Sequence, residues 1–200
     1  MAIRRPAPRA KQFLACLFLG FFSFEFLIPL ISAASPARQS HKGFHRIAPY
    51  VPTPLPVVER MLKVAGVGPT DVVYDLGSGD GRIVIMAAQE FGARGVGIEI
   101  NPQLCRASSE RIAKLGLEGR ARILNEDMFK INVRPATVVT LYLKTAMNEE
   151  LRPILERDLR PGTRVVTQEF QVPGWTPQKV VEMKSPEDGL TYTLYLYVRP

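Results

Sequence analysis

A glycine-rich stretch at residues 75–82, Asp-Leu-Gly-Ser-Gly-Asp-Gly-Arg, contains the residue types best suited to binding a nucleoside. Glycines let the backbone turn tightly and approach a ligand without a Cβ in the way. Glu99 lies 22 residues beyond Gly77, the spacing at which an acidic side chain after the next strand accepts hydrogen bonds from ribose hydroxyls. Asp127 follows a third apolar run, where its carboxylate can accept from an adenine amino group. Together these positions predict a nucleoside-binding site.

The spacing of the glycines argues against a dinucleotide ligand. A dinucleotide fingerprint reads G-x-G-x-x-G, and its third glycine permits close packing of the following helix. Here the pattern is G-x-G-x-G, and Arg82 stands at the sixth position. The chain also lacks a second mononucleotide-binding half, because its C-terminal end has the pattern of a hairpin. These observations disfavour a nicotinamide dinucleotide.

The elements that position these residues alternate between short apolar strands and helices. Strands are expected at 71–76, 95–100, 121–125, 136–143 and 163–170, and helices at 56–65, 82–91, 102–115 and 147–159, with Pro153 forcing a start or a kink in the last. Such alternation is typical of parallel βαβ units. Residues 178–184 and 190–198 then predict two antiparallel strands around a turn. The expected fold is an α/β sheet of seven strands, five parallel strands closed by a C-terminal antiparallel hairpin, with its ligand at the carboxyl ends of the strands.

Residues 1–34 combine a basic start with an apolar segment at 13–34. This segment has 22 residues, interrupted by Glu25 and Pro29, and about 20 apolar residues suffice for a helix to cross a bilayer. Two interpretations compete, an uncleaved membrane anchor and a signal peptide cleaved after Ser-Ala-Ala at 32–34. The length favours the anchor, since signal cores usually hold about 7–15 apolar residues. We therefore expect an N-terminal hydrophobic helix in the membrane, a proline-rich basic linker at 35–54, and one globular domain at 55–200.

The net charge of +7 is concentrated near the N-terminus. Residues 1–70 hold nine Lys or Arg and two acidic residues, whereas residues 71–200 hold 17 basic and 17 acidic residues. A nucleic-acid-binding domain carries a basic footprint of its own, so nucleic acid is not an expected partner. Two distant cysteines, Cys16 and Cys105, exclude a disulfide framework and a cysteine-built zinc site. No metal site is expected.

The sequence resembles the class I S-adenosylmethionine-dependent methyltransferases over about residues 55–200. Residues 75–81 resemble the first motif of that family, Glu99 its ribose-binding acid and Asp127 its adenine-contacting acid. The resemblance implies a Rossmann-like methyltransferase sheet and S-adenosylmethionine as the cofactor. The residues that it implies for cofactor binding are Asp75, Gly77, Ser78, Gly79, Gly81, Glu99 and Asp127.

Three shorter stretches, at 49–53, 74–82 and 139–143, resemble a narrower group. This group contains the membrane-anchored protein lysine methyltransferases of mitochondrial ATP synthase c-subunit and adenine nucleotide translocase, with their prokaryotic relatives. Those proteins also carry a hydrophobic N-terminal segment before a Pro-Tyr motif. The Asn-Pro-Pro-Tyr signature of many nitrogen methyltransferases is absent, and Thr-Leu-Tyr-Leu at 140–143 stands in its place.

The narrower resemblance implies a lysine of a membrane or membrane-associated protein as the methyl acceptor. Two alternatives stay open, a methyltransferase for a small molecule such as a quinone or lipid, and a non-catalytic domain that only binds the donor. Because the donor is made inside cells, we expect the domain on the side of the membrane that contains S-adenosylmethionine. Export after signal cleavage is the alternative.

Two tyrosines are the candidate catalytic residues. Methyl transfer from a sulfonium needs mainly the correct orientation of donor and acceptor, so neither a nucleophile nor a metal is required. Tyr142, at the end of the fourth strand, is expected to orient the acceptor or to face a cation with its ring. Tyr50, in the Pro-Tyr motif, is expected to fold over the donor as a lid.

Overall fold

The computed structural model describes residues 50–200. The expected hydrophobic helix at 13–34 and most of the linker lie outside these residues. Within them, the helices are α1 (Leu55–Val64), α2 (Arg82–Glu90), α3 (Pro102–Lys114) and α4 (Thr145–Asp158). The strands are β1 (Val72–Leu76), β2 (Arg94–Ile98), β3 (Ala121–Leu124), β4 (Val138–Leu141), β5 (Arg164–Gln168), β6 (Lys179–Lys184) and β7 (Thr191–Val198).

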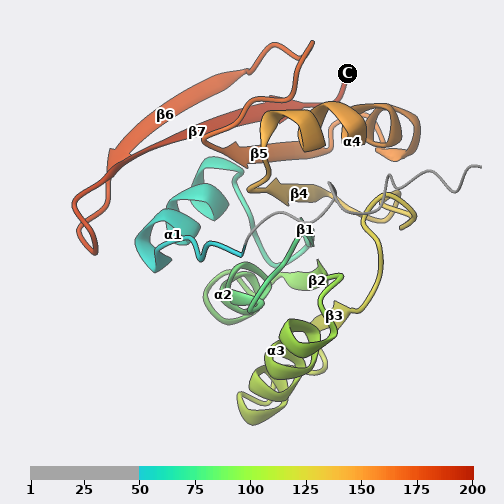
Figure 1. Ribbon diagram of the computed structural model, residues 1–200, viewed down its shortest axis with the longest axis vertical. Coiled ribbons are helices and arrows are strands. Elements are labelled where there is room, and N and C mark those ends of the chain that lie inside the picture. The colour runs from blue at the N-terminus through green and yellow to red at the C-terminus, as the bar shows by residue number, and fades with distance from the viewer. Residues whose placement is uncertain (1–49) are drawn as a thin grey trace, which may run out of the picture. The chain divides into compact units, whose positions relative to one another are not determined.

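The strands form one seven-stranded sheet in the order β3-β2-β1-β4-β5-β7-β6. Strands β1 to β5 pair in parallel, whereas β7 runs antiparallel to both β5 and β6. The order reverses at β1, which is the switch point at which ligands bind in such sheets. Five parallel strands and a closing antiparallel hairpin confirm the sheet that the alternation of elements predicted (Figure 1).

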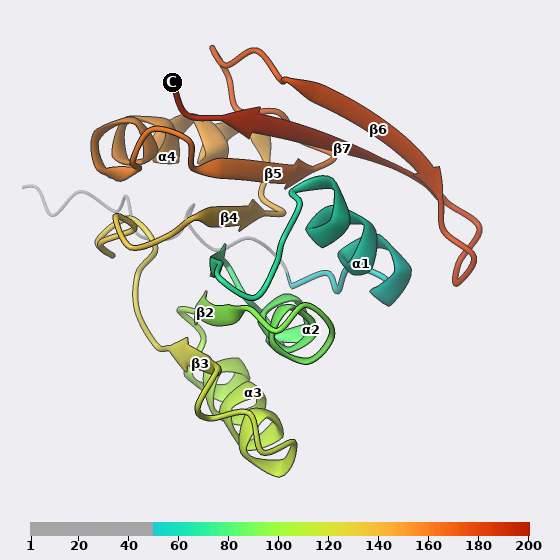
Figure 2. The same ribbon diagram turned by 180° about the vertical axis from the view of Figure 1, so that it is seen from behind.

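Helices cover both faces of the sheet. On one face, apolar side chains of α1 and α2 pack on β1, β4, β5 and β7, and α3 packs beside α2 on β3. On the other face, Leu151 and Leu155 of α4 pack with the side chains of β1, β2, β4 and β5. Both ribbon views show β6 and β7 reaching beyond the other strands, beside α1 (Figures 1 and 2). There, Leu55 N at the start of α1 donates to Glu187 in the β6–β7 turn, at 3.1 Å.

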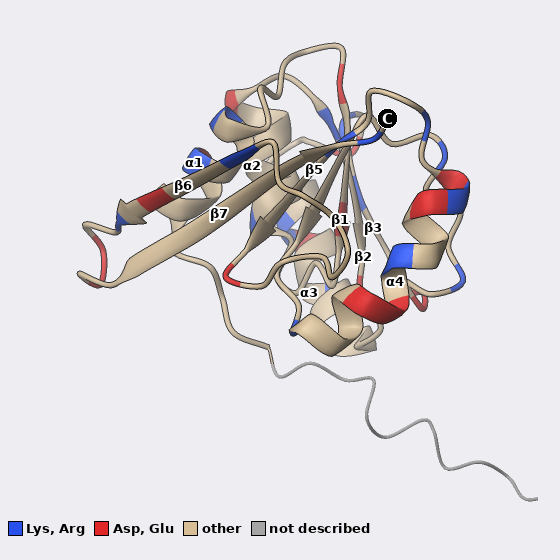
Figure 3. Cartoon of the chain, turned by 90° about the horizontal axis from the view of Figure 1, so that it is seen from above, with Lys and Arg blue, Asp and Glu red and all other residues tan. Residues whose placement is uncertain are grey.

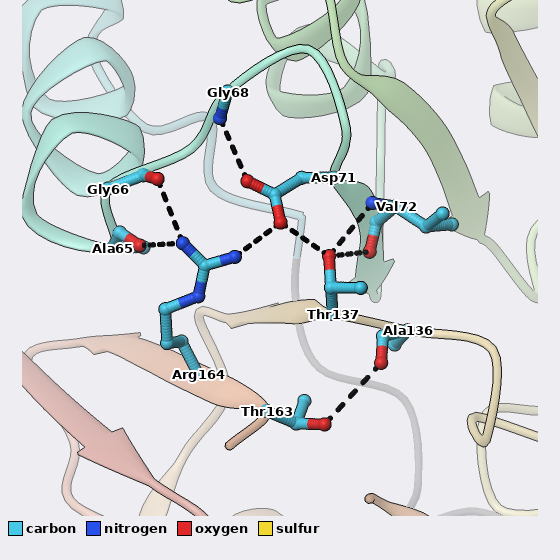
Figure 4. Close-up of polar contacts among 9 residues, drawn as sticks. All are labelled: Ala65, Gly66, Gly68, Asp71, Val72, Ala136, Thr137, Thr163 and Arg164. Atoms are coloured by element: carbon cyan, nitrogen blue, oxygen red, sulfur yellow. Dashed lines mark hydrogen bonds and ion pairs between the residues drawn. The ribbon is translucent and has the colours of Figure 1, made fainter.

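A polar network fastens the amino ends of the strands. Arg164, the first residue of β5, forms an ion pair with Asp71 and donates from Nη1 to the carbonyls of Ala65 and Gly66, each at 2.8 Å (Figure 4). The Asp71 carboxylate also accepts from Thr137 Oγ1 at 2.7 Å and from Gly68 N at 2.8 Å. The end of α1 and the starts of β1, β4 and β5 are therefore held together at the edge away from the glycine loop.

Element boundaries differ from the sequence prediction in one informative place. Helix α4 begins at Thr145 and continues through Pro153, so the proline does not start it. Proline removes one helical N–H donor, but Met147, Leu151 and Leu155 are buried along this helix and hold it against the sheet. Across residues 50–200, the helices are too short or too polar to span a membrane.

Candidate functional site

A cavity of about 680 Å³ opens at the carboxyl ends of the parallel strands, bounded by the loops that follow β1, β2, β3, β4 and β5. Six of the residues predicted to bind the cofactor line it, namely Asp75, Gly77, Ser78, Gly79, Glu99 and Asp127. Tyr50 and Tyr142 line it as well. Its volume lies within the range of about 300–1,000 Å³ that is usual for small-molecule sites. The structure thus brings together residues that are spread over more than 90 positions of the sequence.

The glycine loop takes a shape that other residues rarely adopt. Gly77, Gly79 and Gly81 all have positive φ, at 85°, 56° and 75°, a region that costs L-residues energy. A Cβ on Gly79 would lie 2.6 Å from the Tyr50 ring. Gly81 does not line the cavity, and a Cβ there would lie 3.1 Å from Ser108 on α3. Its place in the structure is that of a packing residue where α2 begins.

Glu99 directly follows β2, and its buried carboxylate is oriented by two backbone donors. Gly79 N donates to Oε2 and Asn101 N donates to Oε1, each at 2.7 Å. The glycine loop is tied to the same strand, because Gly77 N and Ser78 N both donate to Ile98 O at 2.9 Å. Glu99 therefore has a fixed position and orientation beside the loop, as a ribose-binding carboxylate needs.

Asp127 lines the cavity from the loop after β3. Its Oδ1 accepts from Phe129 N at 3.0 Å, and Lys130 Nζ lies 3.6 Å from Oδ2. Asn125 Nδ2 donates to Glu99 O at 2.8 Å, which joins this loop to the end of β2. Asp127 and Glu99 are thus held at neighbouring strand ends, where the prediction places the adenine and ribose contacts.

Asp75 is a buried carboxylate on β1 that faces the cavity. Thr140 on β4 donates to Asp75 Oδ1 at 2.7 Å. Burial raises the pKa of Asp75 to about 6, and the Thr140 hydrogen bond only partly opposes this shift. A positive ligand group beside the carboxylate favours its ionised form. This part of the cavity is therefore suited to a cationic group.

The segment at residues 50–53 closes over the glycine loop. Arg82 Nη1 donates to Thr53 O at 2.6 Å, and Arg82 Nε and Nη2 donate to the Asp80 carboxylate at 2.9 and 2.8 Å. Thr53 Oγ1 also donates to the buried Gln168 at the end of β5, at 2.7 Å. Sequence reasoning missed Arg82, Thr53 and Gln168 as determinants of the site. The Pro-Tyr motif beside the segment was the available signal.

The other end of the cavity is bounded by the loops after β4 and β5. Tyr142, Leu143 and Phe170 line it there. The fully buried Asn148 of α4 joins the two loops, because its Nδ2 is within 3.1–3.3 Å of the carbonyls of Leu143, Phe170 and Gln171. Burial is the main cause of a raised Tyr142 pKa, and the negative charge of Glu169 adds to it.

Comparison with known proteins identifies the family. Residues 75–179 match the model of the ANTKMT methyltransferase domain, which covers just over half of the 200 residues. The chain belongs to this methyltransferase family. It is 50% identical over 152 residues to the protein-lysine N-methyltransferase of Saccharolobus islandicus, covering 75% of this chain and 92% of that protein.

Two further relatives extend the ANTKMT domain comparison. The adenine nucleotide translocase lysine N-methyltransferase of Mus musculus is 34% identical over 145 residues, which are 70% of this chain and 62% of that protein. The crystal structure of an RNA methyltransferase from Salinibacter ruber in complex with S-adenosyl-L-homocysteine superposes with a TM-score of 0.71. It is 47% identical and covers 75% of this chain and 94% of that one.

The cofactor of this ANTKMT-family methyltransferase is S-adenosylmethionine, which supplies an electrophilic methyl group on a sulfonium. The described residues fit it. The glycines with positive φ leave space beside Glu99, whose carboxylate would accept from the ribose hydroxyls, and the Asp75 carboxylate, which lines the same cavity, would accept from the ammonium group of the donor. Tyr50 and residues 51–53 cover part of the glycine loop. Tyr142 and Phe170 line the cavity at the β4–β5 end.

Proposed function

We propose that this S-adenosylmethionine-dependent methyltransferase methylates a lysine side chain of a protein. The observation that carries the proposal is the 50% identity to a protein-lysine N-methyltransferase over 92% of that relative's length. A lysine must reach the methyl group as a neutral amine, and an apolar channel favours loss of its proton by removing the ammonium from water. The cavity wall formed by Tyr142, Leu143 and Phe170 is of this kind.

We further propose that the acceptor protein lies in or at a membrane. The support is the apolar segment at 13–34, which 15 intervening residues separate from Tyr50 at the cavity wall. A chain of that length spans at most about 50 Å when fully extended. With 13–34 as a membrane anchor, the cavity works close to the bilayer surface, on the side that contains S-adenosylmethionine. Protease treatment of intact spheroplasts or organelles tests on which side the domain lies. A domain that faces inward, toward S-adenosylmethionine, is protected from the protease, whereas a domain that faces outward is digested.

RNA is the second candidate acceptor, because the Salinibacter ruber relative is described as an RNA methyltransferase. The charge distribution favours protein over RNA. Residues 71–200 carry equal numbers of basic and acidic residues, and both signs occur along α4 and along β6 (Figure 3). Proteins that bind RNA through its phosphates concentrate Lys and Arg on one face.

The deciding experiment follows a labelled methyl group into cell fractions. The full-length protein is incubated with S-adenosylmethionine, tritiated in the methyl group, and an extract of cells lacking the enzyme. We expect label as Nε-methyl-lysine in hydrolysates of the membrane proteins. Label in RNA supports the second candidate, label in the organic phase supports a lipid or quinone acceptor, and donor binding without any label indicates a non-catalytic domain.

The Glu99→Ala variant is the control for this experiment. Its substitution removes the carboxylate that Gly79 N and Asn101 N hold beside the glycine loop. Incorporation that depends on the donor site therefore disappears in the variant. Label that persists in it comes from a contaminating enzyme and does not support the proposal.

A further inference from the structure

The backbone turns sharply at Glu169, where β5 ends beside the cavity. Phe170 N donates to Gln168 O at 2.7 Å, which closes a three-residue turn. Glu169, at its centre, has φ 62° and is the one non-glycine residue in the described part of the chain with positive φ. A three-residue turn with positive φ at its centre is rare and strained. Strain of this kind persists where other contacts fix it, and it clusters at functional sites.

Two hydrogen bonds to β7 fix this turn. Glu169 N donates to Thr193 O at 2.8 Å, and Thr193 N donates to Glu169 Oε1 at 2.9 Å. The side chain is half-buried, and within residues 50–200 no Lys or Arg forms an ion pair with it. A glycine would adopt the same backbone without strain, so the turn itself does not explain a glutamate at this position.

The turn lies at the acceptor end of the cavity. Phe170, the next residue, lines the cavity together with Tyr142 from the neighbouring strand end. The charge of Glu169 reaches the Tyr142 phenol and contributes to its raised pKa, after the larger effect of burial. Asn148 fixes the carbonyl of Phe170 to the loop after β4. Tyr142 and Phe170 therefore line the cavity where the acceptor must approach, and Glu169 adjoins Phe170 in the chain without lining the cavity itself.

From the strained turn at Glu169 and its place beside Tyr142 and Phe170, we propose that Glu169 binds the ammonium group of the incoming lysine. This inference rests on the proposed lysine acceptor. One carboxylate oxygen is held by Thr193 N, which directs the group, and a charge-assisted bond from an ammonium to a carboxylate is short and strong. The rings of Tyr142 and Phe170 add a surface that attracts a cation. Glu169 thus binds and selects the acceptor as it arrives in the ammonium form, and the loss of the proton that methyl transfer requires follows this step; the donor site lies on the β1–β3 side.

The test uses Glu169→Gln, which keeps an oxygen for Thr193 N and removes the charge. Glu182→Gln is the matched control, because Glu182 is an exposed glutamate on β6, paired in register with the same Thr193. The full-length proteins are saturated with S-adenosylhomocysteine and titrated with n-butylammonium chloride, a lysine side-chain mimic, by NMR. We expect wild type and Glu182→Gln to bind it, and Glu169→Gln to bind at least five-fold more weakly. Equal binding by the two variants, or none by wild type, overturns the proposal.

A second measurement separates this inference from the proposed function. With labelled donor and the membrane-protein extract, we expect Glu169→Gln to raise the KM for the acceptor about ten-fold, with donor affinity unchanged. Methyl-lysine formed at the wild-type KM by the variant refutes the role of Glu169 and leaves the lysine acceptor standing. Absence of methyl-lysine with the wild-type enzyme refutes the proposed function itself.

Discussion

Asp75 gives the sharpest test of how this site is built. Its pKa rises from 3.8 to about 6 because the carboxyl group is buried. The folded pKa lies above the unfolded one, so Asp75 favours the folded state most below about pH 4, and this contribution is lost as the pH rises through about 6. A pKa that is higher by about two in the folded state corresponds to about 3 kcal/mol of free energy. The free enzyme therefore holds a destabilising charge at neutral pH.

Replacing Asp75 with asparagine removes that charge and keeps an oxygen for the Thr140 hydroxyl. The difference in unfolding free energy between Asp75→Asn and wild type therefore shifts in favour of the variant as the pH rises. Linkage gives a shift of about 1.4 kcal/mol between pH 5 and pH 7.5, whatever constant offset the amide introduces. Donor affinity moves the opposite way, and we expect it to fall at least about ten-fold, since a charge-assisted contact is lost.

Urea unfolding of both proteins across this pH range, together with calorimetric titration with S-adenosylmethionine, measures the two effects. Glu110→Gln, which removes an exposed carboxylate from α3, is the control for the loss of one negative charge. A difference between Asp75→Asn and wild type that stays constant with pH would refute the reasoning. So would a variant that binds the donor as tightly as wild type.

Three further substitutions test the supports of the site. Arg164→Met removes the ion pair to Asp71 and the donor to two carbonyls, so we expect urea unfolding to show an unfolding free energy lower by about 2 kcal/mol, with calorimetric donor affinity unchanged. Gly97→Ala places a Cβ 2.3 Å from Ser78 Oγ, and the displaced glycine loop is expected to bind the donor at least about ten-fold more weakly by calorimetry; wild-type affinity contradicts this. Asn148→Ala frees the loops after β4 and β5 from each other, so steady-state kinetics should show a higher acceptor KM while the donor dissociation constant stays the same.

The donor side of the site could be predicted from sequence because its residues lie at the end of a strand or in the loop that follows one. Parallel strands end at one edge of the sheet, so Glu99 after β2 and Asp127 in the loop after β3 had to meet the glycine loop. The closing hairpin could be predicted equally well, because side-chain types in the β7 sequence TYTLYLYV alternate with period two. The local sequence pattern was enough to place a residue wherever its position depended only on the strand that it follows.

The remaining features depend on contacts between distant residues. The hydrogen bond from Thr53 to Gln168 joins positions 115 apart, and no local pattern predicts such a partner. Glu169 gave no signal because a glutamate in a strand sequence does not indicate positive φ. Gly81 was predicted to bind the cofactor from its motif, and that contact stays a prediction; the structure places Gly81 outside the cavity lining, where a Cβ would meet Ser108 and Ile123.

The Asp71–Arg164 network at the amino ends of the strands has a consequence for how such enzymes diverge. It fastens α1, β1, β4 and β5 at the edge opposite the loops that face the substrate. Replacing those loops during evolution leaves this fastening in place, so new acceptors can be tried without first losing the fold. One fold can thereby give rise to enzymes for different acceptors, each keeping the same methyl donor and the same Asp71–Arg164 network.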